Sequence, residues 1–210
     1  MSEESKLLMQ RFMEAFQNGA GDVNRRNIML HAVDVFSKKG YSGAKIKDIA
    51  SSAGFSQGYV YSYYKSKDEL FVKIAEIALD GAAQSVIWAS RLQGTPLERI
   101  TWLTEAYLST DSVALQHWRF NLLLSAAADG VPEEAKLLAE QKKSEPIANL
   151  VPLLQEGQTL GEIVEGNPVS LAIAYFSLMQ GLGLTRSAMG SDGGLFPSVE
   201  MALRLLKRQT

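Results

Sequence analysis

Apolar residues recur at helical spacing along most of the chain, whereas the alternation of apolar and polar residues that forms strands is scarce. Between Asn24 and Gly40 the apolar positions fall at i, i+4, i+7 and i+8, which predicts an amphipathic helix that Asn24 caps and Gly40 ends. Residues Glu3–Gln17 show a looser helical pattern, with leucine and phenylalanine on one side. We therefore expect an all-α protein.

The helical segments change in length along the chain. Short helices are predicted over 46–52 and 57–64, followed by a long helix that Ser66 caps. Beyond residue 94 the pattern predicts longer helices, and two internal prolines, Pro146 and Pro152, should kink or divide the third of them. These longer helices are expected at Pro96–Ser109, Ser112–Ala128, Pro132–Gly157, Pro168–Met189 and Phe196–Lys207.

This change in length predicts three parts. Residues 1–23 form an amino-terminal extension whose role the sequence leaves open: it can pack on the body, touch DNA or be disordered. Residues 24–73 form a domain of three helices, and residues 74–210 a larger helical domain.

The segment Ile46–Lys65 has the spacing of a helix-turn-helix. Two helices that cross steeply need a small residue at the crossing, a glycine with positive φ in the turn, and an apolar residue from the second helix that fills the gap. Ala50, Gly54 and Val60 stand at these offsets, and Ser56 is placed to cap the second helix. A packing corner without function can show the same spacing, so the flanking residues must decide.

The second helix of this motif carries side chains that donate and accept hydrogen bonds, with lysines after its end. These residues are Gln57, Tyr59, Tyr61, Ser62, Tyr63, Lys65 and Lys67. The major groove of B-DNA is wide enough for such a helix and exposes a readable pattern of donors and acceptors. The side chains of the second helix and the lysines after it therefore favour DNA binding.

Charge is distributed unevenly along the chain. Residues 24–73 hold nine basic and four acidic side chains, a local net charge of +5, so the whole-chain value of −2 leaves −7 for the rest. A basic module beside an acidic body is typical of a phosphate-binding domain with a separate regulatory domain, although an unevenly charged surface alone would give the same numbers.

Three stretches carry a family resemblance: Val-Phe-Ser-Lys-Lys-Gly-Tyr at 35–41, Asp-Ile-Ala-Ser-Ser-Ala-Gly-Phe-Ser at 48–56 and Val-Tyr-Ser-Tyr-Tyr-Lys-Ser-Lys-Asp-Glu-Leu at 60–70. Together they resemble the amino-terminal domain of TetR-family repressors, strongly over about a quarter of the chain. The resemblance implies base contacts by Gln57, Tyr59 and Tyr63. It implies phosphate contacts by Lys47, Tyr61 and Lys67, and we add Ser56 and Ser62 to the expected DNA-binding set.

The sequence departs from that family at two of these positions. Threonine is common in the family where this chain has Lys45 and Tyr59. The resemblance therefore leaves open which residue caps the first motif helix and whether position 59 makes the family's base contact.

The resemblance also implies that residues 24–73 are the DNA-binding domain and residues 74–210 the domain for regulation, ligand binding and dimerisation. It implies a homodimer that binds double-stranded operator DNA and is released by a small-molecule inducer. Pro168–Met189 is apolar on more than one face, and with the last helix it can form a four-helix bundle with a partner, although an intrachain core would look similar. The alternatives are an activator, or a chromosome-associated protein that recruits a protein partner without an inducer. The operator, the regulated genes and the inducer are not encoded in any visible pattern.

Aromatic residues of the carboxy-terminal part can line a ligand pocket or simply fill the core. The candidates are Trp88, Trp102, Tyr107, His117, Trp118 and Tyr175.

Other functions find little support. A short segment matches the nucleophile elbow of serine hydrolases, Gly54-Phe-Ser56-Gln-Gly58. It follows a predicted helix rather than a strand, so we expect no catalysis. The chain has no cysteine and no cluster of metal ligands, which predicts no metal and no cofactor. His31 is expected on a solvated helix face. Met1–Gln10 lacks the features of a secretory signal, and Ser170–Leu184 is interpreted as a buried helix, not a membrane span, so a cytoplasmic protein is expected.

Overall fold

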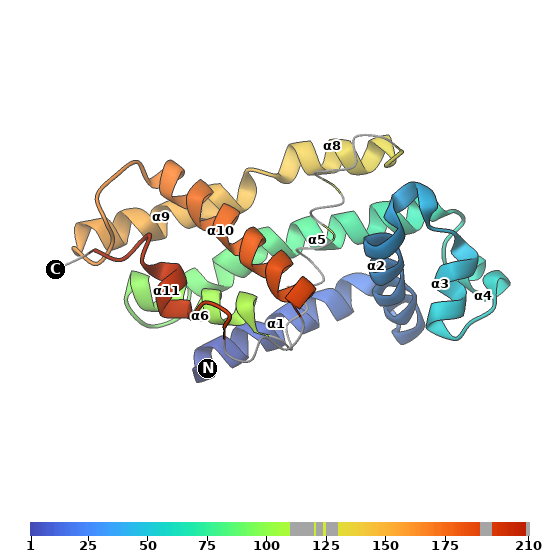
Figure 1. Ribbon diagram of the computed structural model, residues 1–210, viewed down its shortest axis with the longest axis horizontal. Helices are drawn as coiled ribbons and strands as arrows, with labels where there is room; N and C mark the ends of the chain where they lie inside the picture. The colour runs from blue at the N-terminus through green and yellow to red at the C-terminus, as the bar shows by residue number, and fades with distance from the viewer. Residues whose placement is uncertain (110–119, 121–123, 125–129, 190–194, 209–210) are drawn as a thin grey trace. The chain divides into compact units, whose positions relative to one another are not determined.

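The computed structural model describes residues 1–109, 120, 124, 130–189 and 195–208. The regular elements of these residues are α-helices (Figure 1), which confirms the predicted all-α class. They are α1 (Glu3–Ala20), α2 (Val23–Gly43), α3 (Ile46–Ala53), α4 (Gln57–Tyr63), α5 (Lys67–Ser90), α6 (Pro96–Leu108), α8 (Glu133–Lys142), α9 (Glu145–Thr159), α10 (Pro168–Met189) and α11 (Val199–Leu203). The helix expected over Ser112–Ala128 lies almost wholly outside the described residues.

The chain divides into two compact units. The first unit comprises residues 1–12, 82–115 and 144–210, and the second comprises 13–81 and 116–143. Helices α1 and α5 contribute residues to both units. The domain limits expected at residues 23 and 73 stay predictions.

The core of the second unit is built from α2, α3, α4 and the first half of α5. Phe71 lies at its centre, with its ring centroid 5.1 Å from that of Phe36 and 4.9 Å from that of Tyr41. Ile28, Ala32, Val35 and Phe36, the apolar stripe expected on α2, are all buried. The predicted amphipathic helix is therefore confirmed.

The ends of α2 differ in part from the expectation. Asp22, not Asn24, is the N-cap, because its Oδ1 accepts the backbone N–H groups of Asn24 at 2.8 Å and Arg25 at 3.0 Å. Either residue type can cap a helix, and two residues of sequence do not separate them. Gly40 interrupts the helical backbone as predicted, with φ +68°.

The prolines of the segment 132–157 act differently from each other. Pro146 occupies the first turn of α9, so the segment divides just before it, into α8 and α9. Pro152 lies inside α9 without ending it, so the helix is not divided there, and a kink at Pro152 stays a prediction. The last helix is also shorter than expected, because Ser198 caps α11 and the helix ends at Leu203.

The first unit is a helical bundle in which α10 contacts α9 and α6, and α6 contacts α9 and α11. Tyr175 of α10 is fully buried, and its hydroxyl lies 2.9 Å from that of Thr104 on α6. Only 22% of Pro168–Arg186 is buried, however, although this stretch is long and apolar enough to cross a membrane. The interpretation of 170–184 as a buried helix was therefore wrong for the chain by itself.

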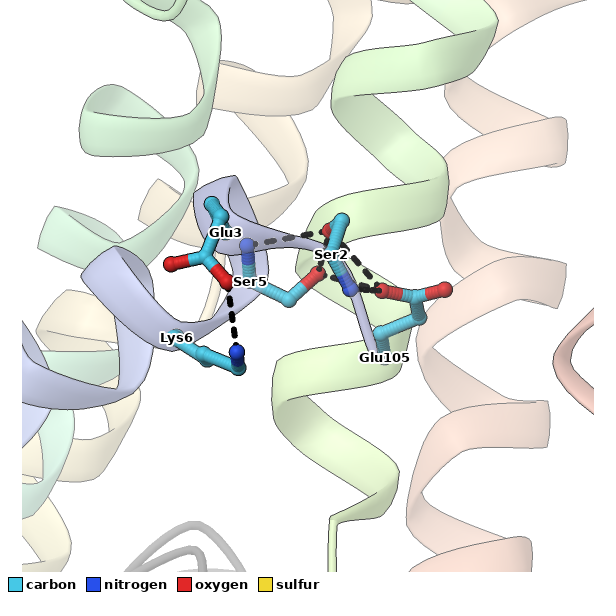
Figure 2. A network of polar contacts seen from close by, with 5 residues as sticks. All are labelled: Ser2, Glu3, Ser5, Lys6 and Glu105. Carbon is cyan, nitrogen blue, oxygen red and sulfur yellow. Dashed lines mark hydrogen bonds and ion pairs between the residues drawn. The ribbon is translucent and has the colours of Figure 1, made fainter.

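The start of α1 is anchored to α6 within the first unit. Glu105 Oε2 accepts three hydrogen bonds, from Ser5 Oγ at 2.6 Å and from the Ser2 backbone N–H and Ser2 Oγ at 3.0 Å each (Figure 2). Burial alone would raise the pKa of Glu105, but these hydrogen bonds outweigh it and lower the pKa. Leu8 and Phe12 are also buried, so this part of the extension packs on the body.

Candidate nucleic-acid interface

The turn between α3 and α4 has the geometry that the motif predicts (cyan in Figure 1). Gly54 adopts the left-handed conformation, with φ +74°, and caps the end of α3. Val60 of α4 is completely buried, and Ala50 of α3 is 2% exposed, so the small residue and the apolar plug meet in the core. Ile49 and Ile46 are buried as well. The helix-turn-helix is therefore confirmed.

The two motif helices begin in different ways. Ser56 caps α4, because its hydroxyl accepts the Tyr59 backbone N–H at 3.1 Å. Lys45 occupies the N-cap of α3 and has no side-chain acceptor, so Asp48 accepts the Lys45 backbone N–H at 3.1 Å instead. The ammonium of Lys39, 3.0 Å from Asp48, hydrogen-bonds this carboxylate and is the largest cause of its lowered pKa.

Helix α4 exposes most of its side chains. Tyr59 is 38% and Tyr61 46% exposed, although both are large side chains that a core could have buried. Gln57 and Ser62 are exposed too, and Ser62 donates a local hydrogen bond to the Tyr59 carbonyl at 2.6 Å. A short helix that is held by one buried residue and presents hydrogen-bonding groups outward can enter a groove of DNA.

Aromatic rings run along one side of α4. The centroid of Tyr59 lies 4.7 Å from that of Phe55 and 5.3 Å from that of Tyr63, and the two tyrosine hydroxyl oxygens are 3.2 Å apart. Packing between the rings fixes the direction of side chains that would otherwise move freely.

Two residues of α2 join this aromatic group, and the sequence analysis missed both. Asn24 Nδ2 donates to the Tyr63 hydroxyl at 3.3 Å, and the Arg25 guanidinium lies 5.8 Å from the centre of the Tyr63 ring. The positive charge at position 25 was a usable signal. The contact itself joins residues 39 positions apart and has no periodic pattern.

The lysines expected to hold phosphate differ in their surroundings. Lys47 is exposed. Lys67 is half-buried, and its ammonium donates to the carbonyls of Tyr41 at 2.7 Å and Ala44 at 3.1 Å. Burial lowers the pKa of Lys67. Lys67 therefore ties the end of α2 to the start of α5, and its phosphate contact stays a prediction.

His31 was expected on a solvated helix face, and the structure differs from this expectation. The side chain is half-buried, and its Nδ1 lies 2.8 Å from the Ser52 hydroxyl. Asn27 adds a second link between α2 and α3, because its Nδ2 donates to the Ala53 carbonyl at 3.3 Å. These contacts hold α3 on the helix that precedes it.

The aromatic candidates for a ligand pocket lie in the first unit or outside the described residues. His117 and Trp118 lie outside. Phe12 stacks on Trp88 at 6.0 Å and on Tyr107 at 5.9 Å, and the Tyr107 hydroxyl is hydrogen-bonded to Ser85. Tyr175 is paired with Thr104, and Trp102 is half-buried. The partners of Tyr107 and Tyr175 favour a core role, and a ligand role stays a prediction.

Comparisons with known proteins agree with this geometry. Residues 28–74 match the family described as bacterial regulatory proteins, tetR family. YfiR of Bacillus subtilis (strain 168), an uncharacterized HTH-type transcriptional regulator, is 28% identical over 87% of this chain and 91% of its own length. The HTH-type transcriptional repressor KstR2 of Mycolicibacterium smegmatis is 27% identical over 72% of this chain and 74% of its own.

Solved structures share the fold. The TetR family transcriptional regulator PfmR from Thermus thermophilus superposes with a TM-score of 0.62 over 83% of this chain and 92% of that one, at 21% sequence identity. The likeness extends beyond the helix-turn-helix to the carboxy-terminal helices.

Proposed function

Because the chain belongs to the TetR family of transcriptional regulators, we propose that it is a repressor that binds a palindromic operator as a homodimer until a small-molecule ligand releases it. The observation that carries this proposal is helix α4, which is anchored by buried Val60 and exposes Gln57, Tyr59 and Tyr61. Lys47, exposed on the neighbouring helix α3, supplies positive charge for the phosphate backbone.

Exposed apolar residues of the first unit support the homodimer. On α10, Val169 is 46% and Ile173 49% exposed, and on α11 Met201 is 54% exposed. Val169 and Ile173 are four positions apart, so they lie on one side of α10. Pairing of two copies through this side would bury these side chains and present two α4 helices to half-sites about 34–36 Å apart, which is one turn of DNA.

Release by a ligand would follow from linkage between the two units. A ligand that binds better to a dimer whose α4 helices have the wrong separation must lower DNA affinity, and DNA must lower ligand affinity by the same factor. Helix α5 contributes residues to both units, which makes it the natural connection. The expected place of action is the cytoplasm.

The test is selection of bound duplexes from a random library with purified protein, followed by an effector screen. We expect enrichment of an inverted repeat and a compound that lowers affinity for it. Enrichment of no sequence would contradict the proposal and favour the chromosome-associated alternative. An enriched repeat that no effector releases would contradict the ligand-controlled step alone.

A further inference from the structure

A chain of polar groups leads from α2 to the exposed side of α4. Asn24 Nδ2 lies 3.3 Å from the Tyr63 hydroxyl oxygen, which lies 3.2 Å from that of Tyr59. Tyr63 is half-buried, whereas Tyr59 is 38% exposed. The last group of the chain is thus the one that faces outward.

The chemistry of these groups gives the series of hydrogen bonds a direction, from Asn24 through Tyr63 to Tyr59. A side-chain amide nitrogen can only donate, so Tyr63 must accept from Asn24. A hydroxyl that accepts a hydrogen bond becomes a stronger donor, so the arrangement in which Tyr63 donates to the Tyr59 oxygen is favoured. The proton of Tyr59 is then left for a partner outside the protein.

Neighbouring charged groups are compatible with this direction. Arg25, whose guanidinium lies 5.8 Å from the Tyr63 ring centre, can only donate and cannot take a tyrosine proton. The Asp22 carboxylate accepts the backbone N–H groups of Asn24 and Arg25 through Oδ1 and lies 3.9 Å from Arg25 Nε. Because the Asp22 carboxylate is occupied at the cap of α2, Asn24 is the group that determines which hydroxyl donates and which accepts.

We propose that Asn24 is a positioning residue that commits Tyr59 to donate a hydrogen bond to DNA, so that the base facing Tyr59 presents an acceptor. This inference rests on the proposed operator binding. In the major groove, guanine O6 and N7 and thymine O4 accept hydrogen bonds and cytosine N4 donates one, whereas adenine carries both an acceptor, N7, and a donor, N6. The operator therefore disfavours cytosine at that base.

A single substitution reverses the direction. In Asn24→Asp the new carboxylate can only accept, so the Tyr63 proton turns toward it and the Tyr59 proton turns toward Tyr63. Tyr59 then presents a lone pair, which suits cytosine N4. One hydrogen bond changes the preference between the two kinds of base by about threefold to tenfold.

The experiment is the duplex selection with the full-length protein, repeated for variants. The base that faces Tyr59 is the one at which Tyr59→Phe loses preference. Asn24→Asp is expected to raise the preference for cytosine over guanine and thymine at that base. Asn27→Asp is the matched control, because it adds the same charge to α2 while Asn27 contacts the Ala53 carbonyl and not Tyr63. Asn27→Asp is expected to weaken DNA binding without changing the preferred base at that position.

Two further variants keep the test decisive if Asn24→Asp fails to fold. Asn24→Ala and Tyr63→Phe each interrupt the series of hydrogen bonds from Asn24 to Tyr59 without adding charge. Each is expected to reduce the preference at this base to less than about twofold. An unchanged preference in both, or an equal shift in Asn27→Asp, would overturn the inference. A wild-type protein that enriches no sequence would instead overturn operator binding, and the inference with it.

Discussion

Helices α4 and α10 expose apolar surface for different reasons. Helix α4 is short, and its exposed large side chains, Tyr59 and Tyr61, carry hydroxyl groups. Helix α10 has 22 residues, and among its side chains over 168–186 the exposed large ones, Val169 and Ile173, are purely aliphatic. An aromatic ring with a polar tip suits a partner that is read by hydrogen bonds, whereas aliphatic surface suits a second apolar face. The chemistry of the exposed atoms thus indicates the kind of partner.

The largest effect is expected in the core that supports α4. Phe71 packs against Phe36, Tyr41 and Phe120, so Phe71→Ala should destabilise the second unit by about 3–5 kcal/mol. Urea unfolding measures this loss. Phe176→Ala removes a half-buried ring of α10 and should cost clearly less. Equal losses would mean that the core around Phe71 is not specifically packed.

The aliphatic side of α10 is tested by charge. Ile173→Glu should dissociate the proposed homodimer, because each copy would bury an unpaired carboxylate at a cost of several kcal/mol, roughly 3 or more. Light scattering at micromolar concentration measures the mass. Leu137→Glu is the matched control, since Leu137 on α8 is 55% exposed and lies on another helix. A dimer that survives Ile173→Glu would assign its interface elsewhere.

The polar side of α4 should separate affinity from preference. Tyr61→Phe should weaken binding to all duplexes by about 1 kcal/mol for each recognition helix, because it removes a hydrogen bond to phosphate. Gln57→Ala should change the preferred sequence. Anisotropy on matched and mismatched duplexes distinguishes the two results. Unchanged preference in Gln57→Ala would refute its assignment to bases.

The smallest effect is expected where α1 meets α6. The folded-state pKa of Glu105 is lowered, so its hydrogen bonds stabilise the protein above the unfolded pKa and are lost as pH falls through the folded pKa. Glu105 is partly exposed, so Ser5→Ala should cost less than about 1 kcal/mol near neutral pH and nothing in strong acid. Thermal unfolding across pH measures this. A loss that is constant with pH would contradict the pKa direction.

The sequence predicted the motif because each of its positions has a distinct physical requirement. Positive φ needs Gly54, the cap needs Ser56, and the crossing needs Val60. Contacts between distant residues have no such signature. Asn24 meets Tyr63 across 39 positions, and the ammonium of Lys67 turns to the carbonyls that end α2.

The body was less predictable for another reason. Hydropathy measures how apolar α10 is, not what covers it, so a helix that is 22% buried was interpreted as buried. Aromatic residues of the body have the same ambiguity, because a ring in a core and a ring in a pocket look alike in sequence.

In the proposed repressor, two copies of α4 read one palindrome. The most direct measurement is fluorescence anisotropy of the selected duplex, of a single half-site and of a scrambled duplex, each across a salt series. We expect one dimer per palindrome, at least about tenfold weaker binding to the half-site, and affinity for the palindrome that falls steeply with salt. Equal affinity for all three duplexes would contradict this expectation.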